Sequence, residues 1–490
     1  MSGTIDVKGR VVGAMVGLAV GDALGVPVEF EPRSARVADP VRDMRGGGTW
    51  KLERGTWSDD TSLALCLAES IVEKGFDPED SGKRSLAWMD DGLWTARGEV
   101  FDVGGATRRA LGKIRSGMPA VLAGGRDEND NGNGSLMRML PASIWLGASA
   151  EGARFRAIAA FSATTHGHPR SILGCWLHCL VAGALLRGEA PKDAYTAAMV
   201  EAGSLLGSLP ASVRAEAGAY SRILDGKLPS LPIGAVRGSG YVVHCLEAAL
   251  WCLTTTADFA SCVLAAVNLG EDADTTGAVA GGLAGLAYGS SAIPADWVAA
   301  LAREAEIEAL AGRLASLVRT PAPLPRSYWV LPGKLLAGGY PVWGVAGQDE
   351  GEGDFVSHLL GAGVDAFLDL TMAGENAGGG YPALPGRRSV PMVDISADAE
   401  ALHRALVELD ALLAAGRTVY VHCLGGFGRT GMVVGSYLVD KGLVPPQEAV
   451  ALIRVLRAET DAPATESPQT TAQCRLVTSR KPGPFSLPLQ

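Results

Sequence analysis

Near the end of the chain, a cysteine and an arginine lie six positions apart around a glycine-rich loop, in the run His422-Cys-Leu-Gly-Gly-Phe-Gly-Arg-Thr-Gly431. An apolar, β-branched stretch (418–421) precedes the loop, and an apolar helical pattern (432–438) follows it. A loop between a strand and a helix N-terminus points backbone N–H groups at one anion. The same field favours a thiolate, which attacks phosphorus, and an arginine fork can hold two phosphate oxygens. A buried cysteine beside a surface arginine is the competing interpretation.

This pattern resembles the signature of cysteine-dependent phosphatases of the compact dual-specificity type, over about residues 328–480. The resemblance implies that Cys423 is the nucleophile and Arg429 the phosphate clamp, with no cofactor in this domain. Thr430 would stabilise the leaving thiolate or help to hydrolyse the phosphocysteine, and His422 would influence the reactivity of the cysteine. The residues implied to bind the phosphate are Leu424, Gly425, Gly426, Phe427, Gly428 and Thr430.

A general acid must also protonate the leaving oxygen. The resemblance places an aspartate on a loop upstream of the cysteine, where Asp394 stands, and Asp398 is the alternative. The Trp-Pro-Asp triplet of classical tyrosine phosphatases is absent, which leaves a preference for phosphotyrosine open. Gln473 resembles a late glutamine that positions water.

Acidic residues gather at three places in the first part of the chain: Glu29, the run Ser58-Asp-Asp-Thr61 and the run Glu271-Asp-Ala-Asp-Thr275. Carboxylates crowded at helix N-termini are costly without a cation, and carboxylate and hydroxyl oxygens are ligands that Mg²⁺ or Mn²⁺ prefers. Ordinary helix capping by Asp and Ser is the alternative for either run alone.

Two helical patterns that lie beside these acids carry glycine at every fourth position. Glycine inside a helix costs about 1 kcal/mol relative to alanine, so the repetition needs a reason. A spacing of four places the glycines on one face and predicts that the two helices pack ridge on ridge. An antiparallel arrangement would bring Glu29 to Asp272 and Asp274; compositional drift is the alternative explanation. The glycines are Gly13, Gly17, Gly21 and Gly25, and Gly277, Gly281, Gly285 and Gly289.

Five short motifs occur in one order over about residues 10–290: Gly21-Asp-Ala-Leu-Gly25 with Glu29, Ser58-Asp-Asp-Thr61, Asn131-Gly-Asn-Gly-Ser135 with Met137-Arg138, Thr165-His-Gly-His168 and Asp272-Ala-Asp-Thr275. Together they resemble the ADP-ribosylglycohydrolase family. The resemblance implies a compact, all-α, orthogonal helical fold that holds two Mg²⁺ ions, with Mn²⁺ as a possible substitute. The implied metal ligands are Ser58, Asp59, Asp60, Asp272, Asp274 and Thr275.

The same resemblance assigns residues to the substrate. Glu29 matches a mobile acidic residue near the reacting centre, and it or an aspartate would transfer a proton. His166 matches a histidine near the ribose. Glu271 stands where glycine is common in the family. The loop that would cradle the diphosphate is Gly132, Asn133, Gly134 and Ser135.

The 490 residues are enough for more than one domain. Helical patterns dominate residues 1–318, for example 63–73, 171–186, 242–253 and 297–318, and a proline-rich linker is expected at 319–326. Short β-rich runs at 328–330, 366–370 and 419–421 then alternate with helical patterns. The sequence predicts a multidomain chain: the all-α domain (1–318), the linker, an α/β cysteine-phosphatase domain (327–480) and a tail (481–490).

The formal charge of -10 argues against broad, nonspecific binding of nucleic acid. The eight cysteines form no Cys-x-x-Cys pair, which favours reduced thiols and a cytoplasmic location. The apolar stretch 11–20 superficially resembles a signal peptide, but acidic residues follow at once, so a buried helix is expected. We expect no membrane span and no membrane partner.

The combined prediction is a bifunctional hydrolase. The helical domain would remove ADP-ribose from a modified protein, nucleic acid or small molecule, and the α/β domain would hydrolyse a phosphorylated substrate through a phosphocysteine. The alternative is a noncatalytic ADP-ribose-binding module that delivers an active phosphatase to modified targets.

Overall fold

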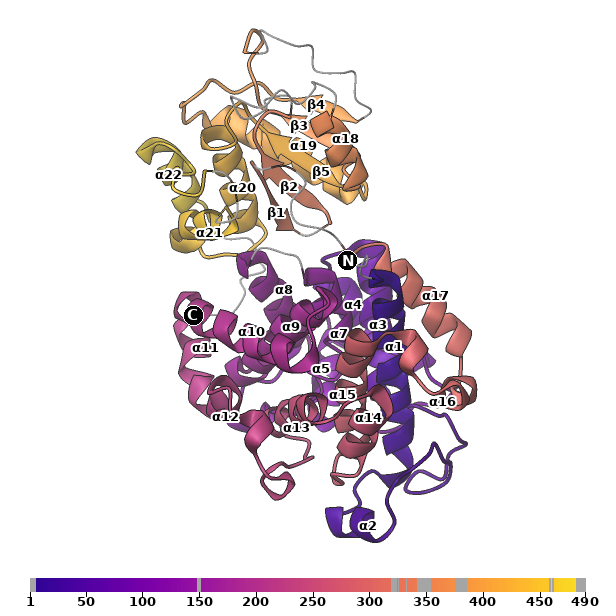
Figure 1. The fold of residues 1–490 in the computed structure, drawn as a ribbon. Helices are drawn as coiled ribbons and strands as arrows, with labels where there is room; N and C mark the ends of the chain where they lie inside the picture. The colour runs from indigo at the N-terminus through magenta and orange to yellow at the C-terminus, as the bar shows by residue number, and fades with distance from the viewer. Residues whose placement is uncertain are drawn as a thin grey trace. The chain divides into compact units, whose positions relative to one another are not determined.

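The computed structural model describes residues 6–147, 151–318, 324, 326–331, 333–341, 354–375, 386–457, 460 and 462–481. The chain forms two compact units: among the described residues, the first contains 6–147 and 157–318, and the second contains 151–156 and the residues after 318. Figure 1 colours the first unit from indigo through magenta and the second from orange to yellow. Most of the expected linker at 319–326, and all of the tail at 481–490 except Lys481, lie outside the described residues.

The first unit is built from α-helices joined by turns and short 3₁₀ segments, and its described residues form isolated β-bridges rather than strands. Its helices are α1 (Val7–Gly25), α2 (Arg33–Ala38), α3 (Asp59–Lys74), α4 (Pro78–Asp91), α5 (Gly105–Arg115), α6 (Ala120–Ala123), α7 (Leu140–Leu146), α8 (Glu151–Ala163), α9 (Pro169–Leu186), α10 (Pro191–Leu205), α11 (Ala211–Ala215), α12 (Ser221–Leu224), α13 (Val242–Thr255), α14 (Phe259–Val267), α15 (Ala273–Tyr288), α16 (Ala295–Ala300) and α17 (Glu304–Ala315).

The two glycine-striped helices, α1 and α15, pack against each other in antiparallel orientation. Gly13 lies against Gly285 at one end, and Gly25 lies against Asp274 at the other. A Cβ atom added to Gly21 would sit 2.0 Å from the carbonyl oxygen of Gly277. Only glycine permits so close an approach of two backbones, and the predicted ridge-on-ridge packing is confirmed.

The helices predicted at 63–73, 171–186 and 242–253 fall within α3, α9 and α13. The single helix predicted at 297–318 is wrong, because α16 ends at Ala300 and α17 begins at Glu304. Arg303 between them adopts a left-handed conformation with φ of 54°. Its guanidinium lies 4.5 Å from the centre of the Trp94 ring and pairs with Glu306, contacts that a continuous apolar pattern does not reveal.

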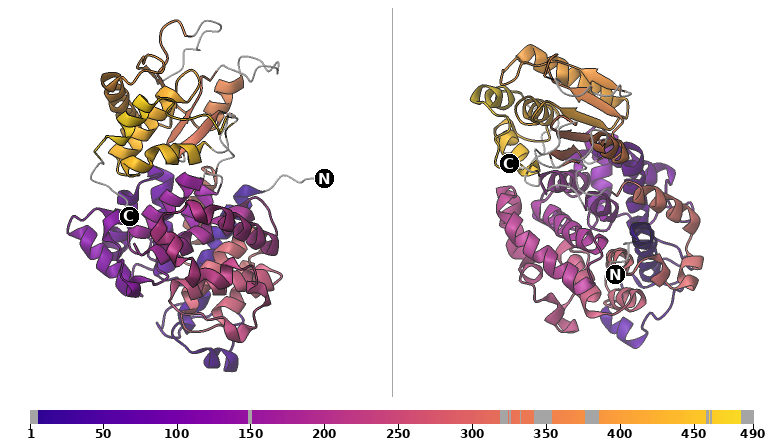
Figure 2. Two further views of the ribbon diagram at one scale, coloured as in Figure 1. Left: turned by 90° about the vertical axis from the view of Figure 1, so that its left-hand side faces the viewer. Right: turned by 45° about the horizontal axis from the view of Figure 1, so that its top comes forward.

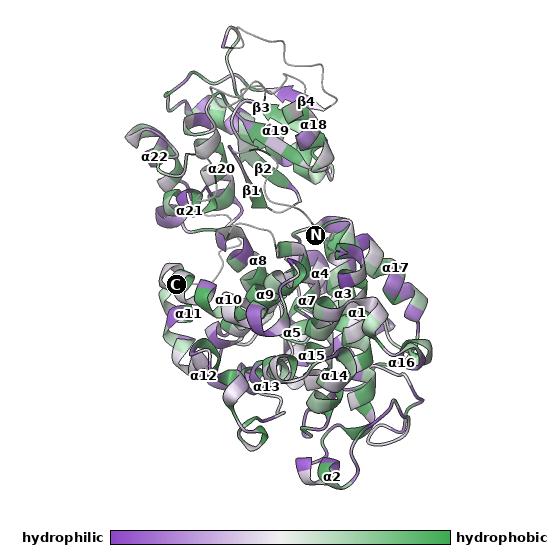
Figure 3. Cartoon of the chain, viewed as in Figure 1, coloured by the Kyte–Doolittle hydropathy of each residue, from purple (hydrophilic) through white to green (hydrophobic). Residues whose placement is uncertain are grey.

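Two helical segments, Val7–Val28 and Pro169–Leu186, are long and apolar enough to cross a membrane by length and composition. Length and composition alone do not separate a membrane span from a core helix, so they do not overturn the expectation of no membrane span. Within the structure, 94% and 89% of their most apolar windows are buried. Burial of this extent is typical of core helices, and Figure 3 shows α9 mostly in the green of apolar residues.

The second unit contains one five-stranded sheet with helices packed against it (Figure 2). The strands lie in the order β1-β2-β5-β3-β4; β1 and β2 pair antiparallel, and the other neighbours are parallel. Its elements are β1 (Ser327–Leu331), β2 (Leu335–Gly338), α18 (Asp354–Gly361), β3 (Ala366–Asp369), β4 (Arg387–Ser389), α19 (Ala399–Ala414), β5 (Val419–His422), α20 (Gly428–Asp440), α21 (Ala449–Leu456) and α22 (Thr471–Thr478).

The register of the parallel strands determines where the chemistry lies. His422, the last residue of β5, is opposite Gly338 of β2 and Asp369 of β3. The loop that begins at Cys423 therefore leaves the sheet at the carboxyl edge of its central strand. Leu359 of α18 packs with Phe367 and Tyr420 in the apolar core of this unit.

Candidate active sites

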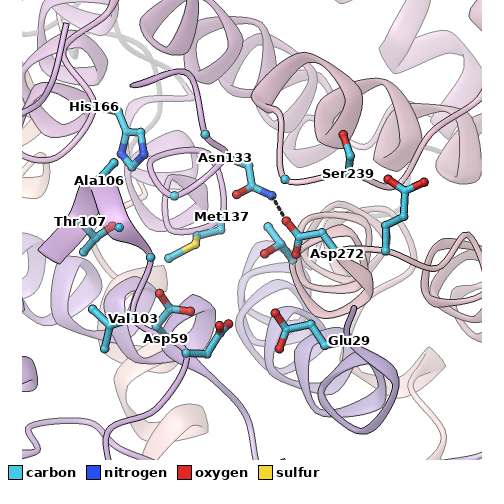
Figure 4. A pocket seen from close by; sticks show the side chains of 18 of the residues that line it. Glu29, Asp59, Val103, Ala106, Thr107, Asn133, Met137, His166, Ser239 and Asp272 are labelled. Atoms are coloured by element: carbon cyan, nitrogen blue, oxygen red, sulfur yellow. Dashed lines mark hydrogen bonds between the residues drawn. The ribbon is translucent and has the colours of Figure 1, made fainter. Parts of the chain in front are cut away.

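A cavity of about 640 Å³ opens in the first unit beside the ends of α1 and α15 and the N-terminus of α5. Figure 4 shows Glu29 and Asp272 on one side of it and His166 and Thr107 on the other, with Asn133 between them. The Nδ2 atom of Asn133 donates a hydrogen bond to Oδ2 of Asp272 at 2.8 Å. The cavity thus has one end lined by carboxylates, including those of Glu29 and Asp272, and another end lined by backbone and by the imidazole of His166.

Carboxylates from three helices converge at the acidic end. Asp22 of α1, Asp60 of α3 and Asp274 of α15 each place one oxygen so that these atoms lie within 4.8 Å of one another. Glu29, Asp272 and Asp274 form a second such group. The antiparallel packing of α1 and α15 brings these groups together, as the sequence predicted from the glycine stripes.

The cluster has the donors that a divalent cation requires. Burial raises the pKa values of Asp60 and Asp274 well above the ordinary range, and neighbouring carboxylates raise them further. Among the described residues, Asp60 Oδ1 and Asp274 Oδ2 are buried without a hydrogen-bond partner. Unpaired, buried carboxylate oxygens are costly, and Mg²⁺ and Mn²⁺ are hard cations that bind such oxygens. The donor set therefore fits a hard divalent metal.

The remaining predicted ligands lie around this cluster. Ser58 caps α3, and its hydroxyl donates to Asp60 Oδ2 at 3.2 Å. The hydroxyl of Thr275 donates to the same oxygen at 3.3 Å. Asp59 is 4% exposed, and burial raises its pKa well above the ordinary range. The structure brings Ser58, Asp60, Asp272, Asp274 and Thr275 together at the acidic end, and the sixth predicted ligand, Asp59, lines the same cavity.

Two acidic residues that the sequence did not assign also belong to this end. Asp22 accepts hydrogen bonds from the backbone N–H groups of Ser58 and Thr61, and burial raises its pKa to about 6. Asp102 lines the cavity, and burial followed by the charge of Asp272 raises its pKa to about 6. Asp22 could have been predicted as a site residue, because it is an acidic residue inside the otherwise apolar helix 7–25. Asp102 could not, because it lies in a loop without a local sequence pattern.

Glu29 is 2% exposed and lies under an aromatic cluster. The indole N–H of Trp50 donates to its Oε2 at 2.5 Å, and the Trp50 ring contacts Phe30 and Phe101. Burial, followed by the charge of Asp102, raises the pKa of Glu29 to about 8. Its carboxyl group is therefore held by a hydrogen bond beneath these rings, and burial favours its protonated form.

Three non-glycine residues that line the cavity have left-handed backbone: Phe30, Asp102 and Glu271, with φ of 64°, 51° and 61°. The N–H of Phe30 donates to the carbonyl of Glu271, and the N–H of Glu271 donates to that of Glu31, both at 2.7 Å. These bonds tie the segment after α1 to the segment before α15. Glu271 occupies a conformation that favours glycine, which accounts for the glycine expected at this position.

The opposite end of the cavity is formed by the loop 132–135 and His166. Asn133 N–H donates to the carbonyl of Gly240, and Gly134 lies against the imidazole, where an added Cβ would be 2.8 Å from Cε1. Burial, followed by the charge of Arg138, lowers the pKa of His166 to about 3, so the ring is neutral. The predicted loop and histidine therefore share one wall.

In the second unit, the loop after β5 folds around the sulfur of Cys423. This residue is 2% exposed, and its Sγ accepts a hydrogen bond from the N–H of Gly426 at 3.3 Å. Gly426 has φ of 79°, and a Cβ there would lie 2.6 Å from the backbone of Gly338. Thr430 donates to the Gly338 carbonyl at 3.4 Å. The predicted loop thus closes around the cysteine, with α20 beginning at its end.

Arg429 lies in a dense set of acceptors. Its guanidinium contacts the Glu375 carboxylate at 2.7 Å and Asp394 at 3.2 Å, and it donates to the carbonyl of Met392 at 3.1 Å. Asp398, in contrast, caps α19 by accepting from two backbone N–H groups at 3.0 Å. The geometry brings Asp394, rather than Asp398, to the arginine of the loop.

Two further predicted residues border this loop. His422 is fully buried with its Nδ1 4.0 Å from Asp369, and burial lowers its pKa to about 4. Gln473 is fully buried and donates to the Ser396 carbonyl at 3.0 Å, and an added Cβ on Gly428 would lie 3.2 Å from its amide. Glu375 was not singled out from the sequence, because a lone glutamate in a loop carries no pattern.

Comparison with known proteins assigns both units. A family model described as ADP-ribosylglycohydrolase matches residues 3–323, and one described as "Polymorphic toxin system, DSP-PTPase phosphatase" matches residues 347–443. An ADP-ribosylarginine hydrolase Tri1 of Pseudomonas putida is 36% identical over 62% of this chain and 77% of its own length. An ADP-ribosyl-[dinitrogen reductase] glycohydrolase of Rhodospirillum rubrum is 33% identical over 62% and 94%.

A solved structure titled "ADP-ribosylglycohydrolase-related protein complex" covers 64% of this chain and 99% of its own, with a TM-score of 0.53 and 36% identity. The helical architecture of residues 6–318 and the small mixed sheet that follows agree with this assignment. The chain belongs to the ADP-ribosylglycohydrolase family and carries a phosphatase domain of the dual-specificity type after its helical domain.

Proposed function

We propose that the first unit hydrolyses the bond between ADP-ribose and the guanidinium group of a modified arginine side chain, with two Mg²⁺ or Mn²⁺ ions. The observation that carries this proposal is the group of buried carboxylates, two of them with unpaired oxygens, beside a cavity of about 640 Å³. The relatives' activities, directed at ADP-ribosylarginine and at ADP-ribosylated dinitrogen reductase, support arginine as the acceptor and a protein as the partner.

The ligands would be Ser58, Asp59, Asp60, Asp272, Asp274 and Thr275, with Asp22 next to them. When bound, the metal pair supplies Lewis acidity that polarises the ribose hydroxyls and a water molecule. The chain's own groups do the rest. Trp50 holds the Glu29 carboxyl in one orientation, and Glu29 or Asp102 exchanges the proton that cleavage of the glycosidic bond requires.

The second unit is proposed to hydrolyse phosphate monoesters. The sulfur of Cys423 attacks phosphorus, so that a sulfur–phosphorus bond forms while the bond to the ester oxygen breaks. Asp394 gives its proton to that leaving oxygen, and Arg429 holds the phosphate oxygens. Water then attacks the phosphocysteine: an oxygen–phosphorus bond forms, the sulfur–phosphorus bond breaks, the proton of the water passes to the Asp394 carboxylate, and phosphate and the thiolate are released. The contact between Asp394 and Arg429 at 3.2 Å supports a location for Asp394 beside the arginine that would hold the phosphate.

The deciding experiment measures release of free ADP-ribose from arginine-linked and serine-linked ADP-ribosylated proteins, with Mg²⁺, with Mn²⁺ and with EDTA. Wild type should release ADP-ribose from the arginine-linked protein with metal only, and Asp272→Ala should release none. Cys423→Ser is the matched control, because its substitution lies in the other unit and should leave this activity intact. Binding of ADP-ribose without any release would favour the noncatalytic binding module.

The same two variants test the phosphatase with phenyl phosphate as substrate. Cys423→Ser should abolish the release of phosphate, and Asp272→Ala should leave it unchanged. Turnover that survives in Cys423→Ser would contradict the phosphocysteine route.

A further inference from the structure

A buried arginine lies beneath the loop 132–135 that borders the cavity. Arg138 is 2% exposed, and its guanidinium donates to the carbonyl of Gly134, to that of Phe161 at 3.1 Å and to Oγ1 of Thr164 at 3.0 Å. All three acceptors are neutral, and within the described ranges no carboxylate pairs with this guanidinium. Burial lowers the pKa of Arg138 to about 10, so the side chain remains charged at neutral pH.

Some other buried arginines have acidic partners, whereas Arg156, among the described residues, has a buried Nη2 without a hydrogen-bond partner. Arg36 pairs with Glu31, and Arg429 pairs with Glu375. The charge of Arg138 is offset in part by the partial negative charge of the last turn of α8, to which Phe161 belongs, and in part by the charge of Asp59. A buried charge without a close counter-ion is destabilising, and such groups cluster at functional sites.

The contact with Gly134 links this charge to the cavity, because Gly134 is a lining residue. The carbonyl that accepts from Arg138 belongs to the same peptide group as the N–H of Ser135, which points the opposite way in a trans peptide. A hydrogen bond to the carbonyl strengthens that N–H as a donor. In the part of the chain that the structure describes, the N–H groups of Gly134 and Ser135 donate to no protein acceptor.

The cavity therefore has opposite charge at its two ends. Glu29 and Asp272 lie on one side of the cavity and the neutral His166 on the other (Figure 4), where the carbonyl of the lining residue Gly134 accepts from Arg138. A dianionic group near the carboxylates would be repelled, whereas one near the loop would be attracted. We propose that Arg138 is a positioning residue whose fixed charge, acting through the Gly134–Ser135 peptide, makes this end of the cavity select a diphosphate. This inference rests on the proposed ADP-ribose hydrolase function.

The test compares binding of ADP with binding of adenosine to the full chain by calorimetry in one Mg²⁺-containing buffer. The two probes share the nucleoside and differ in the diphosphate. Arg138→Gln keeps N–H donors without the charge, and Arg138→Lys keeps the charge with fewer donors. Arg115→Gln is the matched control, because it removes an arginine that is exposed and paired with Asp90. Circular dichroism verifies that each variant is folded.

Arg138→Gln should weaken ADP binding by about tenfold or more, while adenosine binding changes by less than about twofold. Arg138→Lys and Arg115→Gln should keep ADP binding within about threefold of wild type. Unchanged ADP binding in Arg138→Gln, or equal losses for ADP and adenosine, would overturn the inference and leave the hydrolase proposal standing. Should Arg138→Gln fail to fold, a loss of ADP affinity in Arg138→Lys as large as tenfold would overturn it. Wild type that binds neither probe would refute the ADP-ribose site itself.

Discussion

Replacing Gly21 with alanine tests whether contact between the backbones of α1 and α15 holds the first unit together. The added methyl group would lie 2.0 Å from the carbonyl oxygen of Gly277 and 2.4 Å from its carbonyl carbon, whereas ordinary contacts begin at 3.4 Å. The two helices would have to separate by about 1.4 Å, the difference between 3.4 and 2.0 Å. No side-chain rotation relieves the clash, because both partners are backbone.

The size of the effect follows from two opposing contributions. Alanine raises helix propensity over glycine by about 1 kcal/mol. Overpacking a close-packed interior costs typically about 1–3 kcal/mol, and the upper value applies where backbone meets backbone. Gly21→Ala should therefore lower the free energy of unfolding by about 2 kcal/mol. Gly203→Ala in α10 is the matched control, since its Cβ meets nothing within 4 Å, and it should raise that free energy by up to about 1 kcal/mol.

Urea denaturation followed by tryptophan fluorescence measures both variants, because eight of the ten tryptophans precede residue 319 and report mainly on the first unit. Gly21→Ala should also lose release of ADP-ribose, since Asp22 is the next residue, and keep phosphatase activity. A Gly21→Ala variant as stable as Gly203→Ala would refute the reasoning that the two backbones are in contact.

In EDTA, the free energy of unfolding should fall as pH rises from about 4 to 6. Burial raises the pKa values of Asp22 and Asp102 to about 6, so the folded protein binds more protons than the unfolded chain in this range. Mg²⁺ should reverse the loss, and urea titrations at stepped pH check both; stability that rises with pH in EDTA would contradict the prediction. Asp394→Asn should lower kcat for phenyl phosphate by about 100-fold or more, as expected for loss of a general acid. Asp398→Asn should leave kcat unchanged, because Asp398 caps α19; equal losses of kcat in both variants would contradict that distinction.

The sequence predicted the first unit well where the signal was local and repeated. The four-residue spacing of glycines was enough to predict that α1 packs against α15. Glycine has no Cβ, so a helix face made of glycines allows a second backbone to approach closely. The same spacing also predicted that Glu29 lies near Asp272 and Asp274. In an antiparallel pair, the C-terminus of one helix lies beside the N-terminus of the other.

Residues whose role depends on contacts with residues far away in the sequence could not be predicted from local patterns. Asp102 reaches the cavity through a loop with left-handed backbone, and nothing in its neighbours indicates that turn. Glu375 meets Arg429 across 54 residues. The break between α16 and α17 depends on Arg303 meeting Trp94, a contact between segments 209 positions apart that periodicity cannot register.

The left-handed backbone of Phe30, Asp102 and Glu271 has a consequence for how this domain tolerates mutation. Each such residue stores on the order of 1–3 kcal/mol, held in place by the surrounding structure. Half of the six non-glycine residues with such backbone in the described part of the first unit therefore line the cavity. Glu271→Gly would relieve one of them, so a screen for thermal stability alone would recover glycine there. Selection for turnover can retain a residue at this rim that selection for folding alone would discard.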